Sequence, residues 1–464
     1  MSFIFSKEKI ITFIVSLALF MDAVDATIIN TAIPAMSHSL SVHPVDLKIA
    51  LISYLLSLAI FIPISGWVAD KFGIKRVFIA ALAVFTLSSL WCGHVQSLYE
   101  LVMARSVQGL GGSLMLPLAC LIILRTFPRH EMVTAMNQVI MVVSIGLMIG
   151  PFVGGFITDH FSWHWIFWVN IPVGFFAIAA AYHWLEDTNT RISKPFDGLG
   201  FILFGGGLAA LTFALSYLSE TTASQRSAWM ILLAAICMLV LYFLHSRGRA
   251  HPLIRLELFR NRTFQVAIFG NLLARLSFGG IPFLLPLLLQ VGLDYSAQLS
   301  GTLLIPIAFG IIISKYSSLR IMRFFGYKRL LILNTILVAL SIWTFRIINN
   351  DTPIYVISIL TFLFGCFISL QYISMNSLVY AEVTAEEHSA ATSILSTIQQ
   401  LAQSFGVAAS ALLLRFYGSA TAQHFPLTIN VFHQTFFALG LLTLCSIGIF
   451  LRLKYDDGQQ MLSI

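Results

Sequence analysis

The sequence predicts an all-α polytopic membrane protein with fourteen transmembrane helices. Of its 464 residues, 58% are hydrophobic and only 10% are charged, whereas about a quarter of the residues in a soluble domain are charged. Apolar runs near the ~20 residues that a helix needs to cross a bilayer recur along the whole chain. Basic residues gather in alternate loops between these runs. Composition and spacing together exclude an ordinary soluble domain.

The order and orientation of the predicted spans follow from these runs. The predicted spans cover residues 10–33, 47–69, 77–97, 98–124, 133–158, 165–185, 198–218, 228–246, 264–290, 297–314, 328–348, 353–380, 389–416 and 431–451. One set of alternate loops holds most of the basic residues, and the opposite set carries only Lys48, Arg226 and Arg346. Cytoplasmic loops are the basic ones, so we expect both termini in the cytoplasm. The net charge of +7 is then explained by the lipid bilayer, and no nucleic acid is expected as a partner.

An internal repeat divides the chain into two halves. Phe-Gly-Ile-Lys-Arg-Val at 72–77 recurs as Phe-Gly-Tyr-Lys-Arg-Leu at 325–330. We therefore expect two parallel six-helix halves, with two extra central helices between them. The predicted boundaries are 1–190 for the first half, 191–262 for the insertion and 263–464 for the second half. Parallel halves are typical of transporters that rock about a site near the middle of the bilayer.

Two carboxylates lie inside the first apolar run. Asp22 and Asp25 are three residues apart, so both face the same side of a helix. A charge at bilayer depth costs about 2.5–3.5 kcal/mol on insertion scales. We expect the two groups to titrate as a coupled pair and to serve proton coupling. The alternative is a polar group that hydrogen-bonds to a neighbouring helix and holds the bundle together.

A deep arginine in the fourth span is a candidate partner for these carboxylates. Residues 101–117 place Arg105 and Gln108 on one helix face. At a rise of 1.5 Å per residue, Arg105 lies ~10 Å and Asp25 ~12 Å below the outer ends of their helices. The matching depths make an Asp25–Arg105 contact feasible. Such a contact serves either proton coupling or a static buried ion pair.

The loop at residues 66–78 reads GWVADKFGIKRVF and is a candidate gate. We expect Gly66 to allow close approach of two helices, Gly73 to turn the loop and Asp70 to form a charged latch that breaks as the helices move. The basic residues within reach of Asp70 are Lys71, Lys75 and Arg76. The alternative is a positive-inside hairpin with a tight turn.

Two further segments follow this loop. Residues 146–155, GLMIGPFVGG, give a smooth helix face that can kink, or else generic packing of small residues. The small residues of this face, together with its proline, are Gly146, Gly150, Pro151, Gly154 and Gly155. Residues 163–172 are rich in tryptophan and suit an interfacial aromatic belt, with a local helix break at Asn170 and Pro172.

Arg275 is the third deep charge, ~16 Å into the ninth span, and Pro282 and Pro286 after it should bend that helix. No carboxylate lies at a comparable depth in the second half. Arg275 therefore pairs across the halves, binds backbone carbonyls or faces a water-filled cavity, where it contacts substrate. The residues that we expect to line a substrate cavity are Asn30, Gln108, Arg275, Gln371, Asn376 and Gln400. The alternative for these side chains is hydrogen bonding between helices. The cysteines and histidines show no metal-ligand spacing, so neither a metal nor another cofactor is expected.

These motifs resemble those of the major facilitator superfamily, and more narrowly its fourteen-helix drug/proton antiporter branch. The resemblance rests on the loop at 66–78, the Arg-x-x-Gln-Gly-x-Gly of 105–111, the Gly-Pro-x-x-Gly-Gly of 150–155 and the runs 25–34 and 163–172. It implies a major facilitator fold, with Asp25 and Arg105 in proton coupling, Gly150-Pro151 in the antiporter helix, and Asp70 and Arg76 in the gate. Asp22 lies outside the shared pattern.

The resemblance also implies a function. We expect a monomeric, proton-coupled exporter of small amphipathic molecules, of the multidrug type, in the inner membrane of a bacterium. It would be driven by the proton motive force and would not be an enzyme, since no nucleophile–base pair is visible at a membrane interface. The alternatives are an exporter of an endogenous metabolite, siderophore or metal chelate, and a proton symporter for uptake. The Gly-Pro-x-x-Gly-Gly run argues against uptake.

Overall fold

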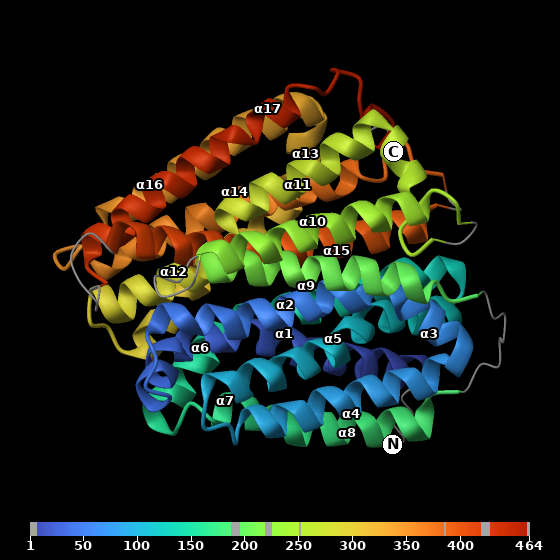
Figure 1. Cartoon of the computed structure of the whole chain (residues 1–464), viewed down its shortest axis with the longest axis horizontal. Helices are drawn as coiled ribbons and strands as arrows, with labels where there is room; N and C mark the ends of the chain where they lie inside the picture. The colour runs from blue at the N-terminus through green and yellow to red at the C-terminus, as the bar shows by residue number, and fades with distance from the viewer. Residues whose placement is uncertain are drawn as a thin grey trace, which may run out of the picture. The chain divides into compact units, whose positions relative to one another are not determined.

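The computed structural model describes residues 7–186, 195–218, 225–249, 252–384, 387–418 and 427–461, and within these ranges the chain forms helices and no strands (Figure 1). Contacts divide the chain into two units. The first comprises Met1–Phe196 with Ala297–Gly301, and the second comprises Asp197–Ser296 with Thr302–Ile464. The predicted boundary between residues 190 and 191 lies outside the described residues. The predicted division into two halves and an insertion therefore stays a prediction.

The first unit is built from long helices joined by short turns. Its helices are α1 Lys7–Ser39, α2 Lys48–Phe61, α3 Ser65–Phe72, α4 Ile74–Cys92, α5 Leu98–Thr126, α6 Arg129–His160, α7 Trp165–Trp168 and α8 Asn170–Trp184. Two short 3₁₀ turns, Pro44–Leu47 and Ile62–Ile64, lead into α2 and α3.

The second unit contains the remaining helices. These are α9 Gly198–Leu218, α10 Gln225–Ser246, α11 Arg262–Phe278, α12 Ile281–Leu287, α13 Ala297–Thr344, α14 Ile354–Leu378, α15 His388–Gly418, α16 Ile429–Cys445 and α17 Ile447–Phe450. The first residues of α13 group with the first unit. Short turns at Leu256–Arg260, Phe345–Ile347 and Gln459–Met461 and a π-helix at Leu288–Gly292 complete the described chain.

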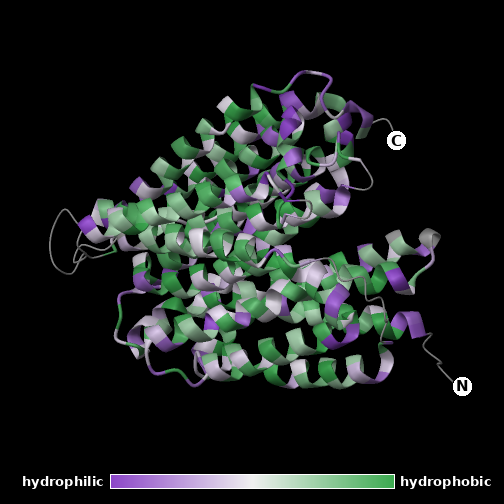
Figure 2. Cartoon of the chain, turned by 45° about the vertical axis from the view of Figure 1, so that its right-hand side comes forward, coloured by the Kyte–Doolittle hydropathy of each residue, from purple (hydrophilic) through white to green (hydrophobic). Residues whose placement is uncertain are grey.

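These helices have the length and composition to cross a membrane. Within the described ranges, twelve segments are long and apolar enough, and hydrophobic residues dominate the helices of both units (Figure 2). A helix satisfies its own backbone polar groups, as the hydrocarbon core requires. The predicted total of fourteen is not settled by this number. The α13 segment is counted once although Gly326 has a left-handed φ of 67° inside it, and α15 is not among the twelve.

Helix α1 lies at the centre of the first unit, where it contacts α5, α6 and α8. The closest of these contacts is made by α6, whose Gly146, Gly150 and Gly154 lie one turn apart. A methyl group at Gly150 would lie 3.1 Å from the Val24 carbonyl oxygen and overlap the Thr27 side chain. The missing side chains on α6 thus let its backbone lie directly against the segment of α1 that carries the two carboxylates.

The C-terminal end of α6 also holds the first residues of α13. The Asp159 carboxylate accepts hydrogen bonds from the backbone N–H groups of Ala297, at 3.2 Å, and Gln298, at 2.7 Å. It therefore satisfies donors that a helix leaves free in its first turn. Gly155 leaves room for the Ala297 backbone at the same place.

In the second unit, a break interrupts the span that carries Arg275. Helix α11 ends at Phe278, and α12 begins at Ile281 after Gly279 and Gly280. The predicted bend is present, and it lies just before Pro282. Helices α14, α15 and α16 contact α11.

The hairpin of α9 and α10 is fixed at one end by Asp197. Its Oδ1 accepts a hydrogen bond from the Gly200 N–H at 3.0 Å, as a helix cap does. The His245 Nε2 of α10 lies 2.8 Å from the same oxygen.

Candidate functional site

The site is built around Asp25, which lies in the middle of α1 and has no exposed surface. The Nη1 of Arg105, on α5, lies 2.6 Å from Asp25 Oδ2, and the arginine side chain is 1% exposed. The structure therefore brings together the two residues whose depths matched. Both charges are removed from water, so each depends on the other for compensation.

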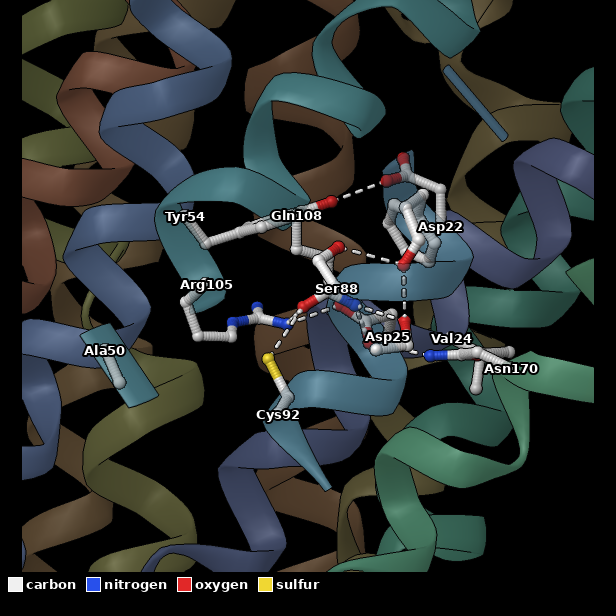
Figure 3. A network of polar contacts seen from close by, with 12 residues as sticks. Asp22, Val24, Asp25, Ala50, Tyr54, Ser88, Cys92, Arg105, Gln108 and Asn170 are labelled. Atoms are coloured by element: carbon white, nitrogen blue, oxygen red, sulfur yellow. Dashed lines mark hydrogen bonds and ion pairs between the residues drawn. The ribbon is translucent and has the colours of Figure 1, made fainter. Parts of the chain in front are cut away.

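Two amides hold the second carboxylate oxygen of Asp25. Gln108 Nε2 donates to Oδ1 at 2.9 Å, and Asn170 Nδ2 donates to the same atom at 2.8 Å (Figure 3). Gln108 also accepts a hydrogen bond from Arg105 Nη1 at 2.7 Å and donates to the Ser89 hydroxyl at 2.8 Å. The ionised carboxylate thus accepts three hydrogen bonds, from side chains on α5 and α8.

Asp22 is held by a separate partner. The Tyr54 hydroxyl, on α2, donates to Asp22 Oδ1 (Figure 3). The ring of Tyr54 lies 4.2 Å from the centre of the Arg105 guanidinium, as in a cation–π contact. Tyr54 therefore touches Arg105 with its face and Asp22 with its hydroxyl. Asp22 keeps some exposed surface, whereas Asp25 has none.

The contact between α1 and α5 in this arrangement depends on the charge of Asp25. A proton on Asp25 would remove the charge that attracts Arg105, and one acceptor oxygen would become a donor. Arg105 would then be a buried cation whose other neighbours are Gln108 and Tyr54, with Nε already lacking a partner. A change in the charge of Asp25 would therefore weaken the contact that joins α1 to α5.

The loop at 66–78 differs from its prediction in two respects. Asp70 is exposed and forms no ion pair or hydrogen bond with any described residue, so the predicted latch is absent in this conformation. Its two nearest basic neighbours are engaged with rings instead: Lys71 lies over Trp67, and Lys75 lies over Tyr182. Adjacent residues of a helix do not face each other, which explains why Lys71 does not reach Asp70.

The two glycines of this loop also behave differently. A methyl group at Gly66 would meet no atom within 4 Å, so the predicted close helix contact at Gly66 is wrong for this structure. Gly73 ends α3 and precedes α4 with a φ of 90°. Side chains rarely tolerate this backbone conformation, so glycine is required at the predicted turn.

Two of the expected cavity residues are enclosed and hydrogen-bonded between helices. Gln108 has no exposed surface and belongs to the Asp25 network. Gln371 is 1% exposed; it accepts a hydrogen bond from Asn334 at 2.8 Å and donates to Thr335 at 3.0 Å. Because both side chains are buried in this way, the structure favours the alternative of hydrogen bonding between helices over a cavity lining for these two residues. A polar residue in an apolar run looks the same in either role.

The other amides of the expected cavity are less enclosed. Asn376 accepts a hydrogen bond from Gln399 at 2.9 Å. Asn30 donates to the Thr27 carbonyl within α1 at 3.3 Å. Gln400 is half-buried and forms no hydrogen bond with any residue that the structure describes. Of these three, Gln400 has its amide free for a ligand.

Arg275 lies on α11 and is 8% exposed. Its Nε donates to Asn271 Oδ1 at 3.2 Å, and its guanidinium lies 3.8 Å from the centre of the Tyr372 ring. Nothing in the sequence indicated Asn271 as a partner of Arg275. Asn170 was predicted only to break a helix, and not to bind Asp25.

Glu186 and His164, which lie outside the spans, have shifted pKa values. A hydrogen bond from Lys7, together with its charge, lowers the pKa of the exposed Glu186. Burial and the neighbouring His94 lower the pKa of His164, which lies in the turn before α7. Glu186 links the ends of α8 and α1, and His164 stacks on Trp163.

Many helices with the length and composition to cross a membrane, with charged side chains buried among them, are typical of multi-pass membrane transporters. The family model of the Major Facilitator Superfamily matches residues 15–407 and again 267–460, and the chain belongs to this superfamily.

Its relatives are proteins named multidrug resistance protein MdtD, a designation that is itself provisional. The protein from Enterobacter sp. (strain 638) is 34% identical over 455 residues, 97% of this chain and 95% of the relative. The one from Klebsiella pneumoniae is 36% identical over 451 residues, 96% and 94% of the two chains.

Solved structures share the fold at low sequence identity. The crystal structure of a D-xylose–proton symporter is 15% identical with a TM-score of 0.67, and the match covers 97% of this chain and 98% of that one. A bacterial homologue of the human lysosomal transporter Spinster, in an inward-facing and unoccupied conformation, is 13% identical with a TM-score of 0.67, covering 98% of both chains. These likenesses concern the fold alone.

Proposed function

We propose that this chain is a proton-coupled exporter of small amphipathic molecules, of the multidrug type, in the inner membrane of a bacterium with both termini in the cytoplasm. The observation that carries the proposal is the buried Asp25, paired with Arg105 at 2.6 Å. The names of the MdtD relatives supply the efflux of drugs. An endogenous metabolite, siderophore or metal chelate would fit the same cycle as cargo.

The cycle begins with Asp25 ionised and held by Arg105, Gln108 and Asn170. A proton from the outer side neutralises Asp25 and releases Arg105, which moves towards Asp22 on the other side of Tyr54. The change of partner repacks α1 against α5 and favours the opposite conformation, as a two-state switch requires. Substrate leaves outward, and the proton leaves to the cytoplasm when Asp25 recovers Arg105.

The motifs of α6 and of the loop at 66–78 have roles in this cycle. The contact of Gly146, Gly150 and Gly154 with α1 lets a small shift of α1 pass to α6, because packed helices have discrete rather than continuous arrangements. The loop latch of Asp70 is open in the described conformation, and in our proposal it closes with Arg76 or Lys75 in the other one. Proline at 151 permits α6 to bend as this happens.

The test uses everted membrane vesicles, whose acidified lumen corresponds to the outside of the cell. We expect wild-type vesicles to accumulate rhodamine 123 and to release lumenal protons as they do so. Asp25→Asn should abolish both, with an unchanged amount of protein in the membrane. Asp351→Asn, which alters an exposed loop, is the matched control. Undiminished proton-driven accumulation by Asp25→Asn would exclude Asp25 from the mechanism.

A further inference from the structure

Arg275 is a buried cation without an acidic partner. Only 8% of its surface is exposed, and it forms no ion pair with any residue that the structure describes. Arg105, the corresponding deep arginine of the first unit, is compensated by Asp25. An uncompensated charge at this depth is costly, and such charges usually mark a ligand or ion pathway.

The second unit offers no carboxylate that could reach Arg275 inside its helices. Among the described residues of this unit, every Asp and Glu lies outside the spans that have the length and composition to cross a membrane. These residues are Asp197, Glu257, Asp294, Asp351, Glu382, Glu387, Asp456 and Asp457. The acidic side chains of the second unit therefore do not supply a negative charge beside Arg275.

The neighbours of Arg275 orient its guanidinium but accept a hydrogen bond from only one of its nitrogens. Asn271 is fully buried, and its Nδ2 donates to the Ala267 carbonyl at 3.2 Å, which turns its Oδ1 towards Arg275 Nε. Tyr372 covers one face of the guanidinium at 3.8 Å. The two terminal nitrogens take no part in these contacts, and Arg275 keeps 8% of its surface exposed. The guanidinium is thus oriented, with its two terminal nitrogens unpaired among the described residues.

The ring that a ligand at Arg275 can reach belongs to Tyr372, which keeps some exposed surface. Phe278 meets Tyr372 edge to face at 5.4 Å between centroids and is itself fully buried, so it supports the tyrosine ring from behind. On α15, the Gly406 backbone lies against the end of α11, and the buried Ser410 hydroxyl beside Gly280 has no hydrogen-bond partner. The guanidinium and the Tyr372 ring are therefore the two groups near the end of α11 that suit an aromatic anion.

We propose that Arg275 binds the carboxylate of an anionic organic substrate, with Asn271 and Tyr372 as positioning residues. The two terminal nitrogens of a guanidinium match the two oxygens of a carboxylate, and such bidentate pairs are among the strongest hydrogen bonds in proteins. The inference names a substrate class for the proposed exporter and rests on that function only for the direction of transport. Binding itself needs no proton gradient.

The first experiment therefore measures binding by fluorescence polarisation of the purified protein, with fluorescein and its methyl ester as probes. The two dyes differ in the carboxylate alone. We expect the wild-type protein to bind fluorescein more tightly than the ester. Arg275→Gln should weaken fluorescein binding by about 10- to 100-fold, the loss of one or two hydrogen bonds to a charged group, and leave the ester unchanged. Arg275→Lys should retain part of the preference.

Controls separate a lost contact from a lost fold. Arg346→Gln removes an exposed arginine of the same unit and should leave both dyes unaffected. Asn271→Leu and Tyr372→Leu should weaken fluorescein binding more than ester binding. Equal wild-type affinity for the two dyes, or an unchanged preference in Arg275→Gln, would overturn the anion site.

A second measurement distinguishes failure of the anion site from failure of the exporter. In everted vesicles, Arg275→Gln should lose accumulation of fluorescein and keep that of rhodamine 123, whereas Asp25→Asn should lose both. Loss of both dyes in Arg275→Gln would assign Arg275 to structure and overturn its substrate role. Normal accumulation in Asp25→Asn, combined with a carboxylate preference in binding, would leave the anion site standing and remove proton coupling.

Discussion

Arg105→Gln is the substitution that most directly tests the buried ion pair. It leaves the Asp25 carboxylate with the two amides of Gln108 and Asn170 and without a compensating charge. Removing one partner of a buried pair costs about 3–5 kcal/mol. The protein has an alternative, because Asp25 can take up a proton instead of staying charged.

The free energy of that protonation sets an upper limit on the destabilisation, and the limit depends on pH. Protonating a carboxyl of ordinary pKa, about 3.9, costs about 1.36 kcal/mol per pH unit above that value, so about 4 kcal/mol at pH 7 and about 1.5 kcal/mol at pH 5. We therefore expect Arg105→Gln to lose about 3–4 kcal/mol of unfolding free energy at pH 7 and about 1.5 kcal/mol at pH 5. The neutral double variant Asp25→Asn/Arg105→Gln should lie within about 1 kcal/mol of wild type, because neither charge is left alone.

The assay is equilibrium unfolding in mixed micelles at increasing mole fractions of sodium dodecyl sulfate, at both pH values. Proton-driven dye accumulation should be absent in the single and double variants alike, which separates stability from mechanism. A destabilisation of Arg105→Gln that is the same at pH 5 and pH 7 would refute the reasoning. So would a double variant less stable than either single one.

Three other predictions concern the packing of α6 against α1, the buried Gln371 and the turn before α7. Gly154→Val places atoms against the Ile28 carbonyl of α1 and should abolish dye accumulation in vesicles, whereas Gly448→Val, in open space on α17, should retain it. Gln371→Leu removes the buried hydrogen bonds with Asn334 and Thr335 and should lower the unfolding free energy by about 1–3 kcal/mol, with an unchanged substrate profile in the dye assay. His164 has its pKa lowered from 6.5 by burial and by His94, so its neutral form stabilises the fold above pH 6.5, and this stability is lost as pH falls through the folded pKa. The unfolding temperature of His164→Gln should therefore depend less on pH below 6.5 than that of wild type.

Depth along a helix was the part of the site that the sequence could predict. The rise per residue placed Asp25 and Arg105 at similar levels, and the structure pairs them. Lateral position was not predictable in this way. Asn170 reaches Asp25 because α8 begins at that residue and lies beside α1, and no spacing within the chain encodes which helix is next to which.

The role of a single polar residue in an apolar run could not be predicted for a related reason. Gln371 and Arg275 were both predicted to line a cavity, with hydrogen bonding between helices as the alternative. Their neighbours in space decide between these two roles. The Gln371 amide bonds to Asn334 and Thr335 on the neighbouring helix, whereas Arg275 contacts one amide oxygen and a ring. The predicted loop latch is not formed in this structure, since Asp70 makes no ion pair with a described residue, and our proposal closes it only in the other conformation.

The two proposals together determine how much charge crosses the membrane in a cycle. Exchange of one inward proton for one outward cation moves no net charge. Exchange of one inward proton for one outward monoanion moves two positive charges inward, and each is worth about 2.3 kcal/mol per 100 mV of membrane potential. A carboxylate bound at Arg275 would therefore gain about 4.6 kcal/mol at 100 mV, negative inside, from the potential alone. Efflux of the monoanion would then continue at zero pH gradient when the potential is held by a potassium diffusion gradient, while efflux of the cation would stop. Equal sensitivity of the two to the potential would be incompatible with one proton per cycle at Asp25 and an anion at Arg275.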